Sequence, residues 1–109
     1  MPAADFRFRL DHKTQPVGCI AIRPLNHSEC EMKRLRVDGD SRGLGLGRVL
    51  ARAALDEARA IGYTVMGLDT AAEMVAAISL YQSLGFTETT PYTHCQLAGA
   101  MFMVKRLDD

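Results

Sequence analysis

The sequence predicts a single α/β domain, with a sheet of mixed strand pairing and two helices in the order β-β-β-α-β-α-β-β. Short stretches of alternating or continuous apolar residues, typical of strands, surround two longer windows with helical periodicity. Each helical window ends at a glycine, Gly62 or Gly85, and glycine suits the left-handed turn that closes many helices. The 109 residues are enough for one hydrophobic core but not for two.

The first part of the chain predicts three strands. Residues 6–10 alternate between apolar and charged side chains and residues 17–22 are mostly apolar, so together they predict an antiparallel hairpin. Residues 30–37 predict a third strand, although their apolar residues are out of phase with a strict alternation. One extra residue in this strand, a β-bulge, would reset the alternation.

The rest of the chain predicts two helices and three further strands. The apolar face of the first helix would consist of Leu46, Leu50, Ala53, Ala54, Ala58 and Ile61. The second helix should begin at the capping-box sequence 70–73 or within a turn of it. Its apolar face would consist of Met74, Ala77, Ile78, Tyr81 and Leu84. Strands are expected at residues 63–68, 86–90 and 100–107.

Composition and charge exclude several classes of function. Thirteen basic and thirteen acidic residues cancel, whereas a nucleic-acid-binding surface needs an excess of Lys and Arg. The three cysteines and three histidines are scattered without zinc-ligand spacing, so we predict no metal site. No stretch resembles a signal peptide or approaches the length of a membrane span. We therefore expect a soluble, cytoplasmic protein with reduced thiols and with neither a nucleic-acid nor a membrane partner.

A glycine-rich segment, residues 42–48, lies between the third strand and the first helix. Glycines at alternate positions let a bulky anion approach the backbone, and the N–H groups at a helix start favour a phosphate. Arg42 and Arg48 flank the glycines and add positive charge. A Walker loop would need Gly-Lys-Ser or Gly-Lys-Thr, and a dinucleotide fingerprint would need glycine where Arg48 stands. The segment therefore predicts a site for a phosphate ester or pyrophosphate, in a ligand that is bound by neither a Walker loop nor a dinucleotide fingerprint.

Two motifs resemble those of the GCN5-related N-acetyltransferase (GNAT) superfamily. Arg42-x-x-Gly45-x-Gly47 matches the family loop [Gln/Arg]-x-x-Gly-x-[Gly/Ala], and residues 77–86 resemble the later helix motif that ends in Gly-Phe. The resemblance extends over residues 17–107. It implies a mixed, mostly antiparallel sheet with two helices, and acetyl-CoA as co-substrate. The implied reaction moves an acetyl group to a primary amine by direct attack in a ternary complex. The alternative is a non-catalytic module, derived from an acetyltransferase, that binds CoA or a partner.

The resemblance also implies which residues bind acetyl-CoA. The third strand would separate from its neighbour, and its backbone would pair with the pantetheine arm through Leu35, Arg36 and Val37. The loop and helix start would hold the pyrophosphate through Arg42, Gly43, Leu44, Gly45, Leu46, Gly47 and Arg48.

Two residues receive catalytic roles from the resemblance. Tyr81 would donate a proton to the departing CoA sulfur, because a phenol with a pKa of about 10 is protonated at neutral pH. The alternative is a core tyrosine on an apolar helix face. Glu31 would act as general base on the amine. The alternative is an exposed strand glutamate that pairs with Lys33 or Arg34.

The sequence departs from the family pattern in two places. Met74 stands where the family commonly has an asparagine that contacts the cofactor arm. By the resemblance, we expect the chain to begin at the family's second strand, without the usual first strand and first two helices, which normally cover the sheet and shape the acceptor site. An uncovered sheet should expose an apolar patch, so we expect a homodimer that covers it. The acceptor amine stays open, and Tyr92 and His94 are candidates for lining its site.

Overall fold

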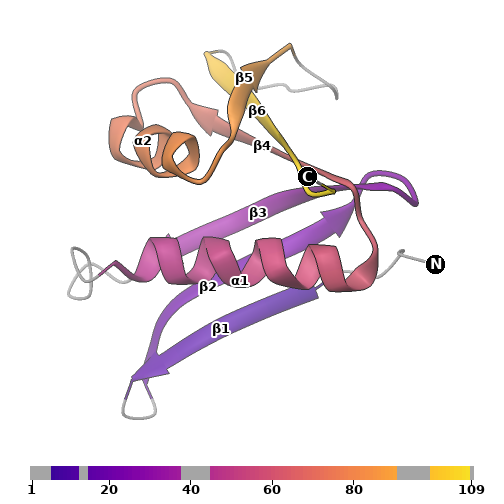
Figure 1. Ribbon diagram of the computed structural model, residues 1–109. Coiled ribbons are helices and arrows are strands. Elements are labelled where there is room, and N and C mark those ends of the chain that lie inside the picture. The colour runs from indigo at the N-terminus through magenta and orange to yellow at the C-terminus, as the bar shows by residue number, and fades with distance from the viewer. Residues whose placement is uncertain (1–5, 13–14, 38–44, 91–98, 109) are drawn as a thin grey trace.

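The computed structural model describes residues 6–12, 15–37, 45–90 and 99–108. Within these residues, six strands and two helices follow one another in the predicted order (Figure 1). They are β1 (Phe6–His12), β2 (Gln15–Pro24), β3 (Glu29–Val37), α1 (Leu46–Ile61), β4 (Val65–Ala71), α2 (Val75–Ser83), β5 (Thr87–Thr89) and β6 (Ala100–Arg106). Neither helix in this described part of the chain is long and apolar enough to cross a membrane.

The strands form one sheet in the order β1-β2-β3-β4-β6-β5. β3 and β4 run parallel, whereas every other neighbouring pair is antiparallel. The prediction of a mixed, mostly antiparallel sheet is therefore confirmed. Figure 1 shows α1 lying along β1, β2 and β3, while α2 lies beside β4 on the other half of the sheet.

β3 contains the extra residue that its sequence pattern predicts. The pairing of β2 with β3 passes from Cys19 opposite Arg36 to Ala21 opposite Lys33. β3 thus advances three residues while β2 advances two, which is a β-bulge. Because of the bulge, Arg36 and Lys33 share one face of the sheet, and the apolar residues of β3 fall out of phase.

α1 packs on the sheet through small and branched apolar side chains. Its buried residues are Leu50, Ala51, Ala54, Leu55 and Ala58. The predicted apolar face is thus partly wrong, because Leu46, Ala53 and Ile61 are only half-buried. The buried residues Ala51 and Leu55 were not predicted. The helix is rotated slightly on the sheet relative to the expected stripe, and only the packing partner sets that rotation.

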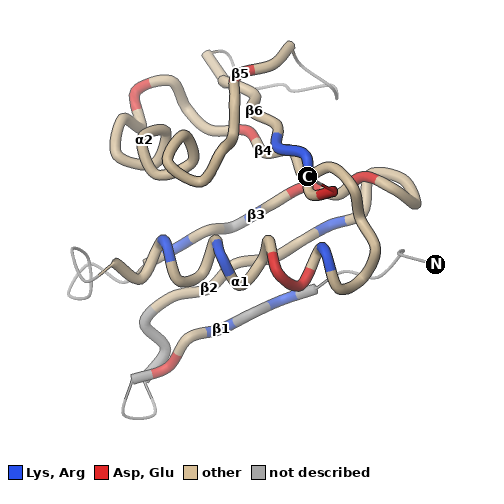
Figure 2. The backbone as a smooth tube through the Cα atoms, in the orientation of Figure 1, with Lys and Arg blue, Asp and Glu red and all other residues tan. Residues whose placement is uncertain are grey.

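The face of β1, β2 and β3 opposite α1 carries positive charge. A Cβ on Gly18 would lie 2.7 Å from Cδ1 of Leu50, so Gly18 points toward α1, and the side chains of alternate residues point the other way. The described side chains on that other face are Arg7, Arg9, Asp11, Cys19, Ala21, Arg23, Glu29, Glu31, Lys33 and Arg36, so basic residues outnumber acidic ones. Figure 2 shows Lys and Arg along all three strands.

The prediction of an exposed apolar patch is therefore wrong for the described residues of this face. The large apolar side chains that are exposed lie elsewhere, at the starts of the two helices: Val49, Met74 and Val75. The homodimer remains a prediction, but the exposed apolar face on which that prediction was based is not present in the described residues.

α2 begins one turn after its capping-box sequence, and the box does not form. Thr70 still belongs to β4, where it lies opposite Met101 of β6. A residue whose backbone is held in a strand cannot cap a helix, so α2 starts at Val75 after Met74, without a side-chain cap. The helix ends as predicted, because Gly85 adopts a left-handed φ of 99° just beyond it.

The thiols in the described residues are not in disulfides. Cys19 is half-buried and Cys30 is buried. Burial raises the pKa of the Cys30 thiol to about 12, and its Sγ donates a hydrogen bond to the carbonyl of Val65 at 3.6 Å. Cys30 is therefore a structural thiol, as predicted, while Cys95 lies outside the described residues.

Candidate active site between β3 and β4

The candidate site lies where β3 and β4 separate. The two strands pair over three residues only, ending at Glu31 opposite Gly67, although they continue to Val37 and Ala71. In the described residues, the edge of β3 that faces β4 therefore pairs with no strand beyond Glu31. Such an edge offers backbone N–H and C=O groups to an extended ligand. Its last part is the segment 35–37, for which the sequence predicts contact with the pantetheine arm.

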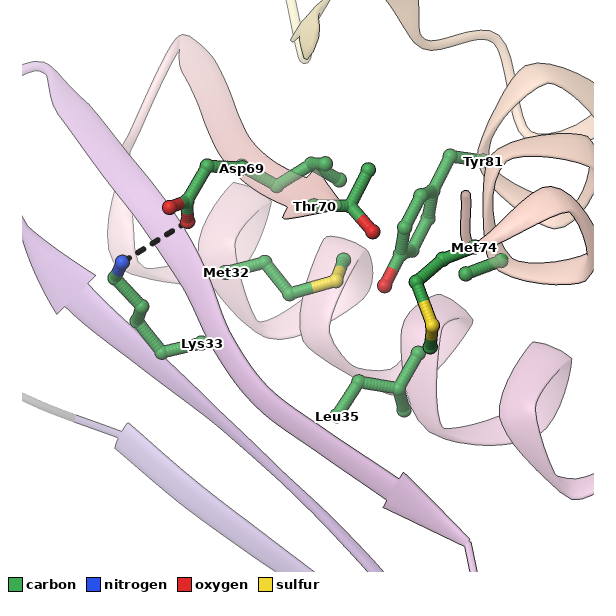
Figure 3. Close-up of a pocket in the computed structure, with 9 residues that line it drawn as sticks. Met32, Lys33, Leu35, Asp69, Thr70, Met74 and Tyr81 are labelled. Carbon is green, nitrogen blue, oxygen red and sulfur yellow. Dashed lines mark hydrogen bonds and ion pairs between the residues drawn. The ribbon is translucent and has the colours of Figure 1, made fainter. Parts of the chain in front are cut away.

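A cavity of about 230 Å³ fills the space between the separated strands. It is lined by Met32, Lys33, Leu35, Leu68, Asp69, Thr70, Met74, Ala77 and Tyr81. Figure 3 shows the ion pair of Lys33 and Asp69 on one side of this space, Leu35, Met74 and Tyr81 on the other, and Met32 between them. The cavity is smaller than the 300–1,000 Å³ typical of sites that enclose whole ligands, so it suits a small reacting group.

Tyr81 reaches from α2 into this cavity (Figure 3). Its side chain is 7% exposed, and its ring packs edge-to-face on Phe86 with the ring centroids 5.9 Å apart. Burial raises the pKa of the Tyr81 phenol above its ordinary value of 10.0, and the negative charge of Asp69 raises it further. The ring therefore belongs to the core, while the hydroxyl lies at the cavity and keeps its proton at neutral pH.

A chain of ion pairs crosses the far side of the cavity. Nζ of Lys33 lies 3.1 Å from Oδ1 of Asp69 and 3.3 Å from Oε1 of Glu31. The same oxygen of Glu31 accepts a hydrogen bond from Arg23 at 2.9 Å. The Glu31 side chain is 0% exposed, and a buried carboxylate is costly unless cations and donors surround it. Lys33 thus connects the buried carboxylate of β3 to the carboxylate that β4 brings to the cavity.

Glu31 does not line the cavity. The sequence offered, as an alternative to the catalytic role, an exposed glutamate that pairs with Lys33 or Arg34. The ion pair with Lys33 is present, but the glutamate is buried and not exposed. The carboxylate at the cavity is Asp69, which sequence reasoning missed. A polar residue at the end of the otherwise apolar stretch Val65–Leu68, shortly before the second helix motif, was a signal that could have identified it.

The start of α1 lies next to this region. Gly45 precedes the helix with a left-handed φ of 76°. The first backbone N–H groups of a helix have no partner inside it, and no acidic side chain neutralises them in the first turn of α1. A Cβ on Gly47 would lie 3.4 Å from Leu80 and 4.0 Å from Val37. The positive end of α1 therefore meets α2 and the end of β3.

The remaining residues with predicted roles lie either in the first turn of α1 or outside the described residues. Leu46 and Arg48 belong to the first turn of α1, where Arg48 is exposed. Arg42, Gly43, Leu44, Tyr92 and His94 lie outside the described residues.

The chain is similar to known acetyltransferases in sequence and in structure. Residues 2–86 match the model of the acetyltransferase (GNAT) family. An uncharacterised N-acetyltransferase of Schizosaccharomyces pombe is 40% identical over 96 residues, which make up 87% of this chain and 58% of that protein. The chain thus spans little more than half the length of that relative.

Solved structures with the same fold include an N-acetyltransferase and a candidate acetyltransferase. The ribosomal-protein-S18-alanine N-acetyltransferase of Escherichia coli has a TM-score of 0.81 and 28% identity, over 94% of this chain and 69% of that one. A candidate acetyltransferase of Salmonella typhimurium, solved with its cofactor acetyl-CoA, has a TM-score of 0.80 and 26% identity. The match covers 94% of this chain and 65% of the Salmonella chain.

Proposed function

Because the chain belongs to the acetyltransferase (GNAT) family, we propose that it transfers an acetyl group from acetyl-CoA to a primary amine by direct attack in a ternary complex. The observation that carries the proposal is the cavity between β3 and β4. It combines a strand edge that pairs with no strand among the described residues, a phenol that holds its proton and a carboxylate within one small space. The strand edge can hold the thioester, the phenol can protonate the leaving sulfur and the carboxylate can take a proton from the amine.

In this proposal, acetyl-CoA lies along the separated part of β3, with its acetyl end in the cavity. Leu35, Arg36 and Val37 offer backbone groups to the amides of the pantetheine arm, as an added strand would pair. The first turn of α1 and the loop before it hold the pyrophosphate, because a helix start attracts an anion. Met74 lines the cavity and makes an apolar contact where the family commonly has an asparagine.

Tyr81 donates the proton that the departing CoA sulfur needs. The raised pKa of the phenol supports this direction of transfer, because a group that holds its proton more tightly stays ready to donate at neutral pH. The lining position of Tyr81, next to the separated part of β3, supports contact with the thioester end of the ligand.

A carboxylate takes the proton that the attacking amine must lose. Asp69 lines the cavity and is suited to direct contact with the amine, whereas Glu31 is joined to it through Lys33. We therefore assign the role of general base to Asp69, and we assign to Glu31 the positioning of Lys33 and Asp69.

Isosteric variants distinguish these two carboxylates. Asp69→Asn should lower kcat about 100-fold, and Glu31→Gln about tenfold, because only the first removes a group that contacts the amine. A larger loss of kcat in Glu31→Gln than in Asp69→Asn would assign the role of general base to Glu31.

Calorimetry with acetyl-CoA tests the proposal as a whole. We expect binding to the 109-residue chain, and we expect Arg48→Ala to raise the Kd about tenfold by removing one cation near the pyrophosphate. The matched control is Arg52→Ala, which removes the same charge one turn further along α1. Absence of binding at millimolar acetyl-CoA would remove the proposal. Binding without turnover on a panel of primary amines would favour the non-catalytic module instead.

A further inference from the structure

The cavity contains an amine of the protein itself. The sequence has three lysines, Lys13, Lys33 and Lys105, and Lys33 lines the cavity between β3 and β4 together with Tyr81 and Asp69. Figure 3 shows the Lys33 side chain on the β3 side of this space, with its Nζ directed at Asp69. The primary amine of Lys33 therefore lies in the same small space as the carboxylate and the phenol of the proposed reaction.

Contacts hold this amine in place rather than leaving it on a solvated side chain. The Lys33 side chain is 32% exposed, and its Nζ contacts Asp69 and Glu31 at 3.1 and 3.3 Å. A nucleophile held near an acyl donor has a high effective concentration, which can replace the encounter with a separate substrate. Lys105 has a different place, near Gly85 and in a hollow lined by residues of α1. Lys13 lies outside the described residues.

We propose that Lys33 is itself acetylated from acetyl-CoA when no acceptor amine occupies the cavity. This inference rests on the proposed function, because it needs the acetyl thioester in the same cavity. The Lys33 Nζ forms a C–N bond to the thioester carbon, and the C–S bond breaks. The nitrogen loses two protons in becoming an amide. One passes through the Asp69 carboxylate to solvent, and the other ends on the leaving sulfur through the Tyr81 hydroxyl.

The modification would limit the enzyme's own activity. The amide of acetyl-lysine carries no charge, so both the Asp69 and the Glu31 carboxylates lose their ion pair with Lys33. The acetyl group also takes up part of a cavity of about 230 Å³ that an acceptor amine has to enter. A single turnover on Lys33 would therefore lower the activity toward added amines.

The test is peptide mapping after incubation of the purified chain with deuterium-labelled acetyl-CoA and no added amine. Lys33 should gain the label at least about tenfold faster than Lys105 in the folded chain, and at the same rate in urea, where the cavity is absent. Tyr81→Phe should slow labelling at Lys33 and leave Lys105 unchanged. Lys33→Arg, which keeps a positive charge beside both carboxylates, should abolish the activity loss that follows preincubation with acetyl-CoA.

The failure of this inference is distinguishable from failure of the proposed function. Suppose that the chain binds acetyl-CoA and acetylates an added amine, but that Lys33 and Lys105 are labelled equally. This result would overturn only the proposed acetylation of Lys33 and would leave the proposed function in place. Absence of acetyl-CoA binding would overturn both.

Discussion

Replacing Tyr81 by phenylalanine is expected to lower kcat about 100-fold while the KM for acetyl-CoA changes by less than about twofold. The substitution removes only the hydroxyl at the cavity and keeps the ring, which packs on Phe86 at a centroid distance of 5.9 Å. The loss should therefore fall on the departure of the CoA sulfur and not on folding or on ligand binding. Steady-state kinetics with an amine that the wild-type chain acetylates provides the measurement.

Tyr63 provides the matched control for this prediction. It is also a buried tyrosine, 2% exposed, but it does not line the cavity between β3 and β4. Tyr63→Phe removes the same hydroxyl from the same kind of ring, so its kcat should stay close to that of the wild-type chain. A kcat within about threefold of wild type in Tyr81→Phe would show that the phenol does not assist the leaving sulfur.

Replacing Leu50 by alanine is expected to lower the free energy of unfolding by about 2–5 kcal/mol. Leu50 is fully buried, and its Cδ1 lies directly over Gly18, where a Cβ would come within 2.7 Å. Truncation would leave a cavity between α1 and β2, because Gly18, which faces Leu50, has no side chain that could move in. Urea unfolding measures the change, and Tm should fall by about 10 °C or more.

The neighbouring residue Val49 is the control for this second prediction. Val49 is 48% exposed at the start of α1, so Val49→Ala should change the free energy of unfolding by no more than about 0.5 kcal/mol. Equal effects of the two substitutions would contradict the packing of α1 on β2 through Leu50. An unchanged slope of free energy against urea concentration would confirm that both variants unfold to the same state.

The local pattern of the sequence predicted the helices and strands because backbone conformation and side-chain alternation depend on residues close together in the chain. The ends of both helices depend on a glycine that can adopt a positive φ, and the structure has 115° at Gly62 and 99° at Gly85. The bulge in β3 was visible as a break in phase, because an extra residue moves the following side chains to the other face. The buried face of α1 was predicted only in part, since a periodic pattern leaves the rotation of the helix on the sheet undetermined.

The sequence by itself thus determined the order of the elements, the C-terminal ends of the two helices and the family motifs, all of which depend on residues close together in the chain. The family resemblance implied that β3 separates from its neighbour, but only the tertiary structure decided that the separation begins beyond Glu31. Only the tertiary structure decided, too, that Lys33 meets Asp69 across 36 positions of sequence. It also decided that Glu31 is buried away from the cavity while Asp69 lines it. Burial and ion pairing depend on groups that approach through space, and local periodicity carries no information about such distant partners.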